Sequence, residues 1–315
     1  MTPELSVILA VGERRDRAPV CLASLLEQEG IERLEILIYD LAPGSPEPIP
    51  GSDHPSVMVE RLPPETLFSM AKARGVEAAR APVVAFIEEH CRALPGWAAA
   101  LIAAHLRGPY AGVGPEVHNG NSNVSFSRSI HVVNYQMFYP GAARGERGML
   151  PGHNSSWKRQ ALLAYGDRLE EYLRAEIVLH LRLVADGYNL LLEPAAKLAH
   201  WNESDLKSAS RGRYLWNRIY AHQRAKAFGW SMARRWGYIL ATPLIPLYSV
   251  VRLVLWLARH RPDLLPTAML GLPRISIAAI AAACGHSAGL LWGPGDADAR
   301  FTWFEMNEHR DPGPA

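Results

Sequence analysis

Short apolar runs alternate with helical patterns over the first hundred residues of this chain. Residues 5–11 are apolar, residues 18–29 place Val20, Leu22, Leu25 and Leu26 on one helical face, and residues 34–40 are apolar again. This is the order of a β-α-β unit, and parallel strands with crossover helices form a doubly wound sheet. The sequence therefore predicts an α/β fold. Further elements of the same pattern are expected at 57–60, 66–80, 83–87 and 95–106. Beyond them, the sequence predicts a long loop over 118–152, a helix over 170–186 and short strands at 188–193 and 197–200.

Two carboxylates and an imidazole end the apolar strand expected at residues 83–87. They belong to the run Glu88-Glu89-His90. In open α/β sheets, ligands bind at the carboxyl ends of the strands, so this run predicts metal-binding or charge-handling groups at that edge. The alternative is that the three residues simply open a solvated loop after a buried strand.

Composition and motif searches exclude several classes of protein. The formal charge of +2 gives no footprint for nucleic-acid binding. No Gly-x-Gly-x-x-Gly follows the first strand and no Walker-type phosphate loop occurs, so the dinucleotide and P-loop interpretations lose their main support. The three cysteines are far apart, which suits a reducing compartment and predicts neither a zinc cluster nor a disulfide framework.

The last third of the chain is basic and then apolar. Residues 203–235 carry eight basic and two acidic side chains, and apolar blocks follow at 236–258 and 268–292. Each block approaches the length of a membrane span, but internal prolines and Arg252 argue against clean spans. Flanking arginines and tryptophans favour helices that lie in a membrane interface. A helical subdomain packed on the rest of the chain or in a dimer fits the same pattern.

Four blocks in order carry a resemblance to glycosyltransferase family 2. The first combines residues 6–14 with 34–40. The second, 75–90, is similar to the family's helix, strand and Asp-x-Asp region. The third, Gly-His-Asn-Ser-Ser-Trp-Lys-Arg-Gln-Ala-Leu at 152–162, and the fourth, Ala-Glu-Ile-Val-Leu-His-Leu-Arg-Leu at 175–183, resemble later family segments. The resemblance implies a GT-A fold, a doubly wound, Rossmann-like mixed sheet, and inverting transfer from a nucleotide-sugar.

The resemblance also implies a metal site. Glu89 and His90 occupy the family's metal-binding positions, with Glu88 beside them on the diphosphate side, and His200 falls where some members present a late histidine. Oxygen ligands suit Mg²⁺ or Mn²⁺, and histidine favours Mn²⁺. Glutamate is one methylene longer than the usual aspartate, and imidazole brings no negative charge. Metal dependence is therefore the open question at this site.

Further roles come from the same resemblance. Glu176 matches the family's general base, although Ala175 replaces the acid before it. The other residues that match family positions are expected near the nucleotide-sugar. For each charged residue among them, the alternative is an ordinary surface charge. These residues are Glu13, Asp40, Lys72, His153 and Asn154.

These observations predict a GT-A domain at residues 1–202, a helical region at 203–295 and a tail at 296–315. The expected activity is metal-assisted transfer from a UDP- or GDP-sugar to a glycan or lipid-linked acceptor, such as an envelope polysaccharide. The second hypothesis is a catalytically impaired GT-A-fold module that binds a sugar nucleotide or a partner. The N-terminus lacks the features of a signal peptide, so we expect a cytoplasmic protein, peripheral at the inner face of the membrane, with a homodimer as a further expectation.

Overall fold

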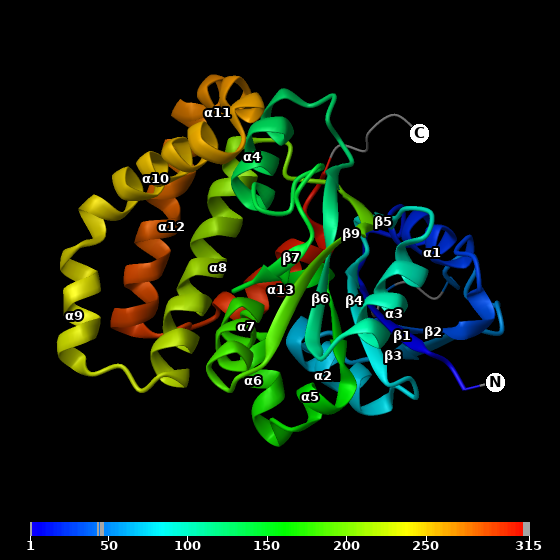
Figure 1. The fold of residues 1–315 in the computed structure, drawn as a ribbon. Helices are drawn as coiled ribbons and strands as arrows, with labels where there is room; N and C mark the ends of the chain where they lie inside the picture. The colour runs from blue at the N-terminus through cyan, green and yellow to red at the C-terminus, as the bar shows by residue number, and fades with distance from the viewer. Residues whose placement is uncertain (1, 43, 45–46, 311–315) are drawn as a thin grey trace. The chain divides into compact units, whose positions relative to one another are not determined.

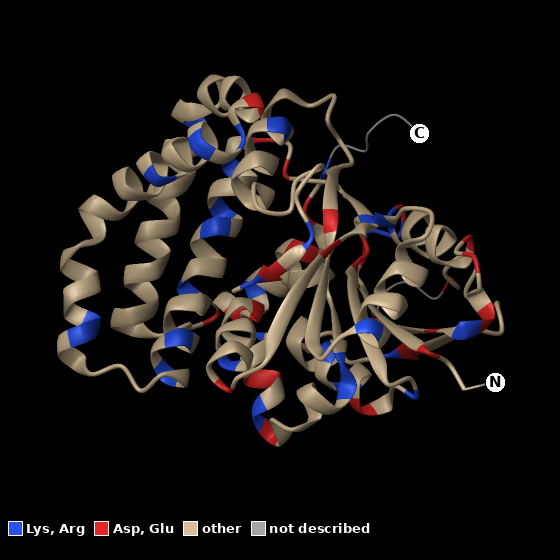
Figure 2. Cartoon of the chain, in the orientation of Figure 1, with Lys and Arg blue, Asp and Glu red and all other residues tan. Residues whose placement is uncertain are grey.

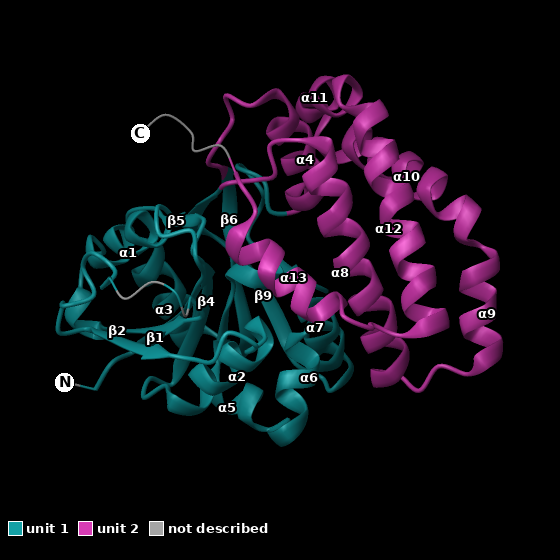
Figure 3. Cartoon of the chain, turned by 180° about the vertical axis from the view of Figure 1, so that it is seen from behind, with its two compact units in different colours: residues 1–118, 138–200 teal, residues 119–137, 201–315 magenta. Residues whose placement is uncertain are grey.

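The computed structural model describes residues 2–42, 44 and 47–310, and the chain forms two compact units (Figures 1 and 3). Unit 1 comprises Met1–His118 and Phe138–His200, and unit 2 comprises Asn119–Met137 and Trp201–Ala315. This division differs from the predicted ranges in two ways. Unit 2 takes in residues 119–137 from the middle of the chain, and the expected tail contains a helix, α13 (Ala297–Asn307).

Unit 1 is built on one mixed sheet. Its strand order is β3-β2-β1-β4-β8-β6-β9-β5, with β7 paired to β9. The first four of these strands are parallel, and the pairs β4–β8, β6–β8, β5–β9 and β7–β9 are antiparallel. The strands are β1 (Leu5–Val11), β2 (Leu34–Asp40), β3 (Val57–Arg61), β4 (Val83–Glu88), β5 (Cys91–Ala93), β6 (Tyr110–Asn119), β7 (Gly145–Arg147), β8 (Ser156–Lys158) and β9 (Asn189–His200).

The parallel strands at the centre are buried along their whole length. Every residue of β1, β2 and β4 is buried, which is typical of parallel strands covered on both faces. Helix α2 approaches β1 closely at Gly75, where an added Cβ would lie 2.7 Å from Cγ2 of Ile8. The predicted α/β fold is confirmed. The helices of unit 1 are α1 (Ala18–Leu26), α2 (Phe68–Ala78), α3 (Trp97–Arg107), α5 (Arg159–Leu163), α6 (Leu169–Leu173) and α7 (Glu176–Ala185).

Three local predictions differ from the structure. The segment 118–152, expected as a loop, contains helix α4 (Ser125–Tyr135), whose Phe126 and Ile130 pack on Ala209 within unit 2. The single helix expected over 170–186 is two helices, because the backbone of Ala175 is extended between α6 and α7. The two short strands expected after 188 are one continuous strand, β9.

Unit 2 is helical. Helix α12 packs directly on α8, since added Cβ atoms on Gly285 and Gly289 would lie 2.2 Å and 2.1 Å from the backbone oxygens of Tyr214 and Arg218. Two stretches, Thr242–His260 and Leu272–Trp292, are long and apolar enough to cross a membrane by length and composition. Besides α4 and α13, its helices are α8 (Leu206–Ala227), α9 (Met232–Leu240), α10 (Ile245–His260), α11 (Leu265–Leu270) and α12 (Leu272–Trp292).

Candidate active site

The candidate site lies at the carboxyl end of the parallel strands. The chain runs outward from β1 through β2 to β3 and then returns to the other side of β1 as β4. The strand order therefore reverses between β1 and β4, which is where doubly wound sheets bind ligands. Glu88 ends β4 at this point, and Gly12 directly follows β1.

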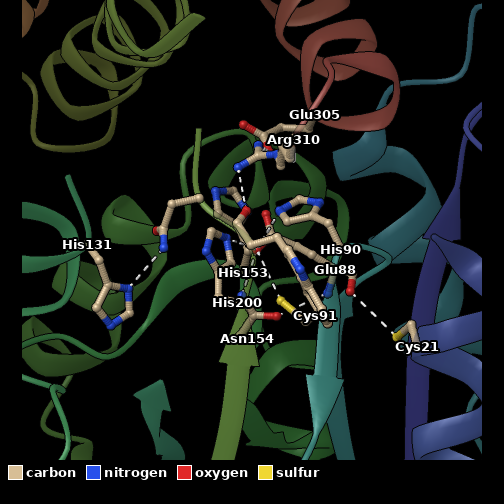
Figure 4. Close-up of polar contacts among 12 residues, drawn as sticks. Cys21, Glu88, His90, Cys91, His131, His153, Asn154, His200, Glu305 and Arg310 are labelled. Carbon is tan, nitrogen blue, oxygen red and sulfur yellow. Dashed lines mark hydrogen bonds and ion pairs between the residues drawn. The ribbon is translucent and has the colours of Figure 1, made fainter. Parts of the chain in front are cut away.

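Three buried side chains form a cluster of metal-ligand types at the end of β4: Glu88, His90 and His200 (Figure 4). One ligand atom from each lies within 4.8 Å of the others. Oε2 of Glu88 is 3.6 Å from Nε2 of His90 and 3.4 Å from Nε2 of His200. The two imidazole rings meet edge to face, with centroids 4.9 Å apart. One carboxylate and two imidazoles are a donor set that can hold a divalent metal, so the residues present fit the predicted divalent cation.

The backbone holds this cluster together across a long stretch of sequence. Strands β5 and β9 pair in antiparallel register with Cys91 opposite His200. This pairing carries His200 to the turn that bears Glu88 and His90. Glu88 is fixed by Asn154, whose Nδ2 donates to Oε2 of Glu88 at 2.6 Å and whose Oδ1 accepts from the Glu88 backbone N–H at 3.0 Å. The predicted residues Glu88, His90, Asn154 and His200 are thus brought together.

The surroundings of Glu88 favour its ionised form. Burial alone would raise the pKa of this carboxyl, but the imidazoles of His90, His153 and His200 outweigh that effect and hold the pKa well below its ordinary value. The site therefore presents an ionised carboxylate oxygen beside the two imidazole rings.

Glu89 lies outside this cluster in the described part of the chain, although the sequence placed it among the metal ligands. Its Oε2 accepts from the backbone N–H of Gly12 at 3.0 Å, and its Oε1 is 3.7 Å from Nη1 of Arg17. Burial raises the pKa of Glu89 to about 8, against the opposing effect of the Gly12 N–H and Arg17. Successive residues at a strand end point in opposite directions, so Glu88 and not Glu89 shares the cluster with His90. Glu89 instead ties the end of β4 to the loop after β1.

A second group joins three more of the predicted residues: Lys72 and Glu176, which are buried, and His153, which is partly exposed. Oε1 of Glu176 accepts from Nζ of Lys72 at 2.7 Å and lies 2.7 Å from Nδ1 of His153. Lys72 comes from α2, His153 from the short turn Gly152–Asn154, and Glu176 from the first turn of α7. The ammonium of Lys72 also lies over the ring of Phe68, 3.8 Å from its centroid.

The charges in this second group stabilise each other. Burial would raise the pKa of Glu176, but His153 and Lys72 outweigh it and lower the pKa to about 2. Burial would lower the pKa of His153, yet the carboxylates of Glu176 and Glu88 raise it above its ordinary value. Glu176 is therefore a fully ionised carboxylate at neutral pH, held by two nitrogen donors.

The two remaining predicted residues lie at the ends of β1 and β2. Asp40 is buried, and its carboxylate accepts from Nη2 of Arg15 at 2.8 Å and from the backbone N–H of Ala42 at 3.0 Å. Glu13 follows β1 and is exposed. Asp40 thus forms an ion pair with Arg15, whereas Glu13 lies at the surface.

Sequence reasoning missed Arg15 and Arg17, which contact Asp40 and Glu89. Their signal was the basic run Arg14-Arg15-Asp16-Arg17 directly after the first strand. A separate depression of about 880 Å³ is lined by Val83 at the start of β4, so it opens at the opposite edge of the sheet from Glu88.

The chain was compared with family models, with curated proteins and with solved structures. The family model described as Glycosyl transferase family 2 matches residues 6–165. A crystal structure of GalNAc-T7 with UDP, GalNAc and Mn²⁺ is similar at 13% sequence identity and a TM-score of 0.46, and the match covers 62% of this chain and 43% of that one. The search of curated proteins found no match. The matched region, which spans half of the chain, and the mixed sheet with its helices identify a GT-A-like fold. The chain belongs to glycosyl transferase family 2.

Proposed function

We propose that this protein transfers a sugar from a nucleotide-sugar donor and uses a divalent metal held by Glu88, His90 and His200. The observation that carries the proposal is this cluster of one carboxylate and two imidazoles at the point where the strand order reverses. Family membership supports the reaction type. The two histidines favour Mn²⁺ over Mg²⁺, because imidazole suits transition metals.

The bound metal would supply Lewis-acid stabilisation of the charge that develops on the nucleotide diphosphate. The chain's own residues prepare that position. Asn154 fixes the orientation of Glu88 by two hydrogen bonds, and strand pairing fixes His200. We assign Asp40, which is anchored at the end of β2 beside Arg15, to contact with the nucleotide base of the donor.

Inversion at the sugar carbon needs a base for the acceptor hydroxyl, and we assign this role to Glu176. Its pKa of about 2 keeps it ionised at any physiological pH, although it also makes the carboxylate a weak base. Oε1 is held by Lys72 and His153. Oε2 lies beside Gly152, where an added Cβ would stand 3.9 Å from it, so the missing side chain leaves space on that side.

One observation favours a second function, a sugar-nucleotide-binding module with impaired catalysis. The buried pair of Lys72 and Glu176 lowers the basicity of the only acid in the matched Ala175-Glu176 position. In that case the protein binds a donor but neither transfers nor hydrolyses it.

The acceptor and the location follow from the rest of the chain. A glycan or lipid-linked acceptor fits a family member with an additional helical unit, and we place the protein in the cytoplasm, peripheral at the inner face of the membrane. A homodimer stays a prediction.

The test is a thermal-shift screen of the intact chain against UDP- and GDP-sugars, each with Mn²⁺, with Mg²⁺ and with chelator. We expect stabilisation by at least one donor that grows with Mn²⁺ and is lost in Glu88→Gln. Donors that bind should then be assayed for release of the nucleoside diphosphate. Binding without release selects the second function, and no binding by any donor overturns both.

A further inference from the structure

Helices α9 and α10 and the short turn Thr242–Leu244 between them carry a line of exposed apolar residues, here called the apolar stripe. Its members follow one another at intervals of three or four residues, apart from one adjacent pair, so they repeat along one face of the helical path. Each is between 45% and 76% exposed. The apolar stripe consists of Met232, Trp236, Leu240, Leu244, Leu247, Tyr248, Val251 and Leu255.

Other residues of the same helices pack within unit 2. Leu253 and Leu257 of α10 are buried, and Tyr238 and Ile239 of α9 pack on a cluster around Trp230 and Leu290. The stripe is therefore a second apolar face, additional to the one that folds the unit. Single exposed apolar residues are normal on a protein surface, but a group of neighbouring ones of this kind marks an interaction site.

The charges around the stripe identify its partner. Residues 206–262 contain no aspartate or glutamate, and the cartoon in Figure 2 has positions coloured as basic but none coloured as acidic along α9 and α10. Basic residues next to an apolar face with tryptophan and tyrosine are typical of segments that bind anionic lipid headgroups. Those on the two helices are Arg234, Arg235, Arg252 and Arg259.

The same helices are unsuited to cross a bilayer. Thr242–His260 qualifies as a span by composition, yet Pro243 and Pro246 occupy its start and Arg252 its middle. Only one side of α10 is exposed and apolar, because Leu253 and Leu257 face the interior of unit 2. Helix α12, the other candidate, packs on α8, which carries Arg218 and Arg224. Because one face of α10 packs within unit 2 and the other is apolar and exposed, we expect this helix to lie along a membrane surface and not to cross it.

We propose that the apolar stripe of α9 and α10 docks unit 2 on an anionic phospholipid surface, with the helices in the plane of one leaflet. The inference rests on the proposed function in one respect: docking on the membrane would bring the site close to the lipid-linked acceptor that we propose. Arginines reach the headgroups while the stripe enters the acyl boundary, so both charge and apolar contact contribute.

The test is flotation of the full chain with vesicles of phosphatidylcholine alone or mixed with phosphatidylglycerol. We expect binding to the mixed vesicles, weakened by salt, and at least about tenfold weaker binding by Leu240→Ser/Leu247→Ser/Leu255→Ser. The matched control is Leu106→Ser, an exposed leucine of α3 in unit 1, which should bind as the unmodified protein does. Replacement of Arg234, Arg235 and Arg252 by glutamine should remove the preference for phosphatidylglycerol.

Several outcomes overturn the proposal. These are absence of vesicle binding, equal binding by the triple leucine variant, or resistance to alkaline carbonate extraction, which a true span would show. A dimer that the triple variant converts to a monomer, without change in vesicle binding, assigns the stripe to a second copy and also overturns it. Thermal shift by soluble nucleotide-sugars needs no lipid, so retained donor binding with lost vesicle binding leaves the proposed function standing. The reverse result removes the proposed function alone.

Discussion

Asn154 binds Glu88 twice, once at the side-chain oxygen and once at the backbone N–H. Both contacts are buried, and Glu88 is the carboxylate that faces His90 and His200. A residue from the turn before β8 thus sets the direction of a side chain at the end of β4.

Asn154→Ala should weaken Mn²⁺ binding by about 10- to 100-fold, because a side chain that orients a metal ligand contributes by that amount. Titration calorimetry of the purified chain measures it. Ser155→Ala is the control, since the hydroxyl of Ser155 donates to the Pro151 carbonyl at 2.6 Å and not to a residue of the cluster. Equal affinity in the two variants would contradict the positioning role of Asn154.

Glu88→Gln should abolish measurable Mn²⁺ binding, while Glu89→Gln should change the affinity by less than about tenfold. The reason is that Glu88 contributes its oxygen to the cluster, whereas Glu89 accepts from Gly12. The two substitutions are chemically identical and adjacent. The opposite ranking would restore Glu89 as the ligand that the family resemblance implied.

Lys72→Met should destabilise the protein by about 3–5 kcal/mol, because it leaves the carboxylate of Glu176 buried without its ammonium partner. Adding Glu176→Gln to this variant should recover part of the loss. Urea denaturation of the single and double variants gives the free energies of unfolding. If the double variant is as unstable as the sum of the single ones, the pair is not coupled.

The same pair predicts a dependence of stability on pH. The pKa of Glu176 falls from 4.5 in the unfolded chain to about 2 in the fold, so its contribution is complete above about pH 4.5 and is lost as pH falls toward 2. Between pH 5 and pH 3, the Glu176→Gln variant should therefore lose less stability than the unmodified protein does. Denaturation midpoints of both proteins, measured at intervals of about half a pH unit, check this expectation. Parallel curves would show that Glu176 carries no such shift.

Gly75→Ala should cost about 1–3 kcal/mol, because the new methyl group meets the buried Ile8 at the contact between α2 and β1. Gly148→Ala serves as the control, since its added Cβ has no atom within 4 Å. Thermal unfolding distinguishes them. A stable Gly75→Ala variant would mean that Ile8 has room to move.

The fold could be predicted from local pattern because strands such as residues 5–11 and 83–87 are apolar throughout and are separated by helical periods. Helix α4 could not be predicted in this way. Most of its residues are polar, and its short apolar face is recognised as such only because it packs on Ala209, which is distant in the sequence. The break at Ala175 was hidden for a related reason, because alanine favours helix and only tertiary contacts impose its extended backbone.

The candidate site was predicted by residue type and corrected by geometry. The run at 88–90 gave the position, but alternation along the strand end decides which glutamate faces the histidines. The buried contacts of Lys72 with Glu176 join residues 104 apart, and a sequence has no local signal for such a pair.

The register that sets Cys91 opposite His200 has a consequence for how the protein matures. The third side chain of the cluster, His200, lies on the last strand of unit 1, beyond the matched region at 6–165. During synthesis, Glu88 and His90 are made well before His200. Binding of the proposed metal would therefore indicate that β9 has joined the sheet. A fragment that ends before β9 would contain Glu88 and His90 without His200, the third side chain of the cluster.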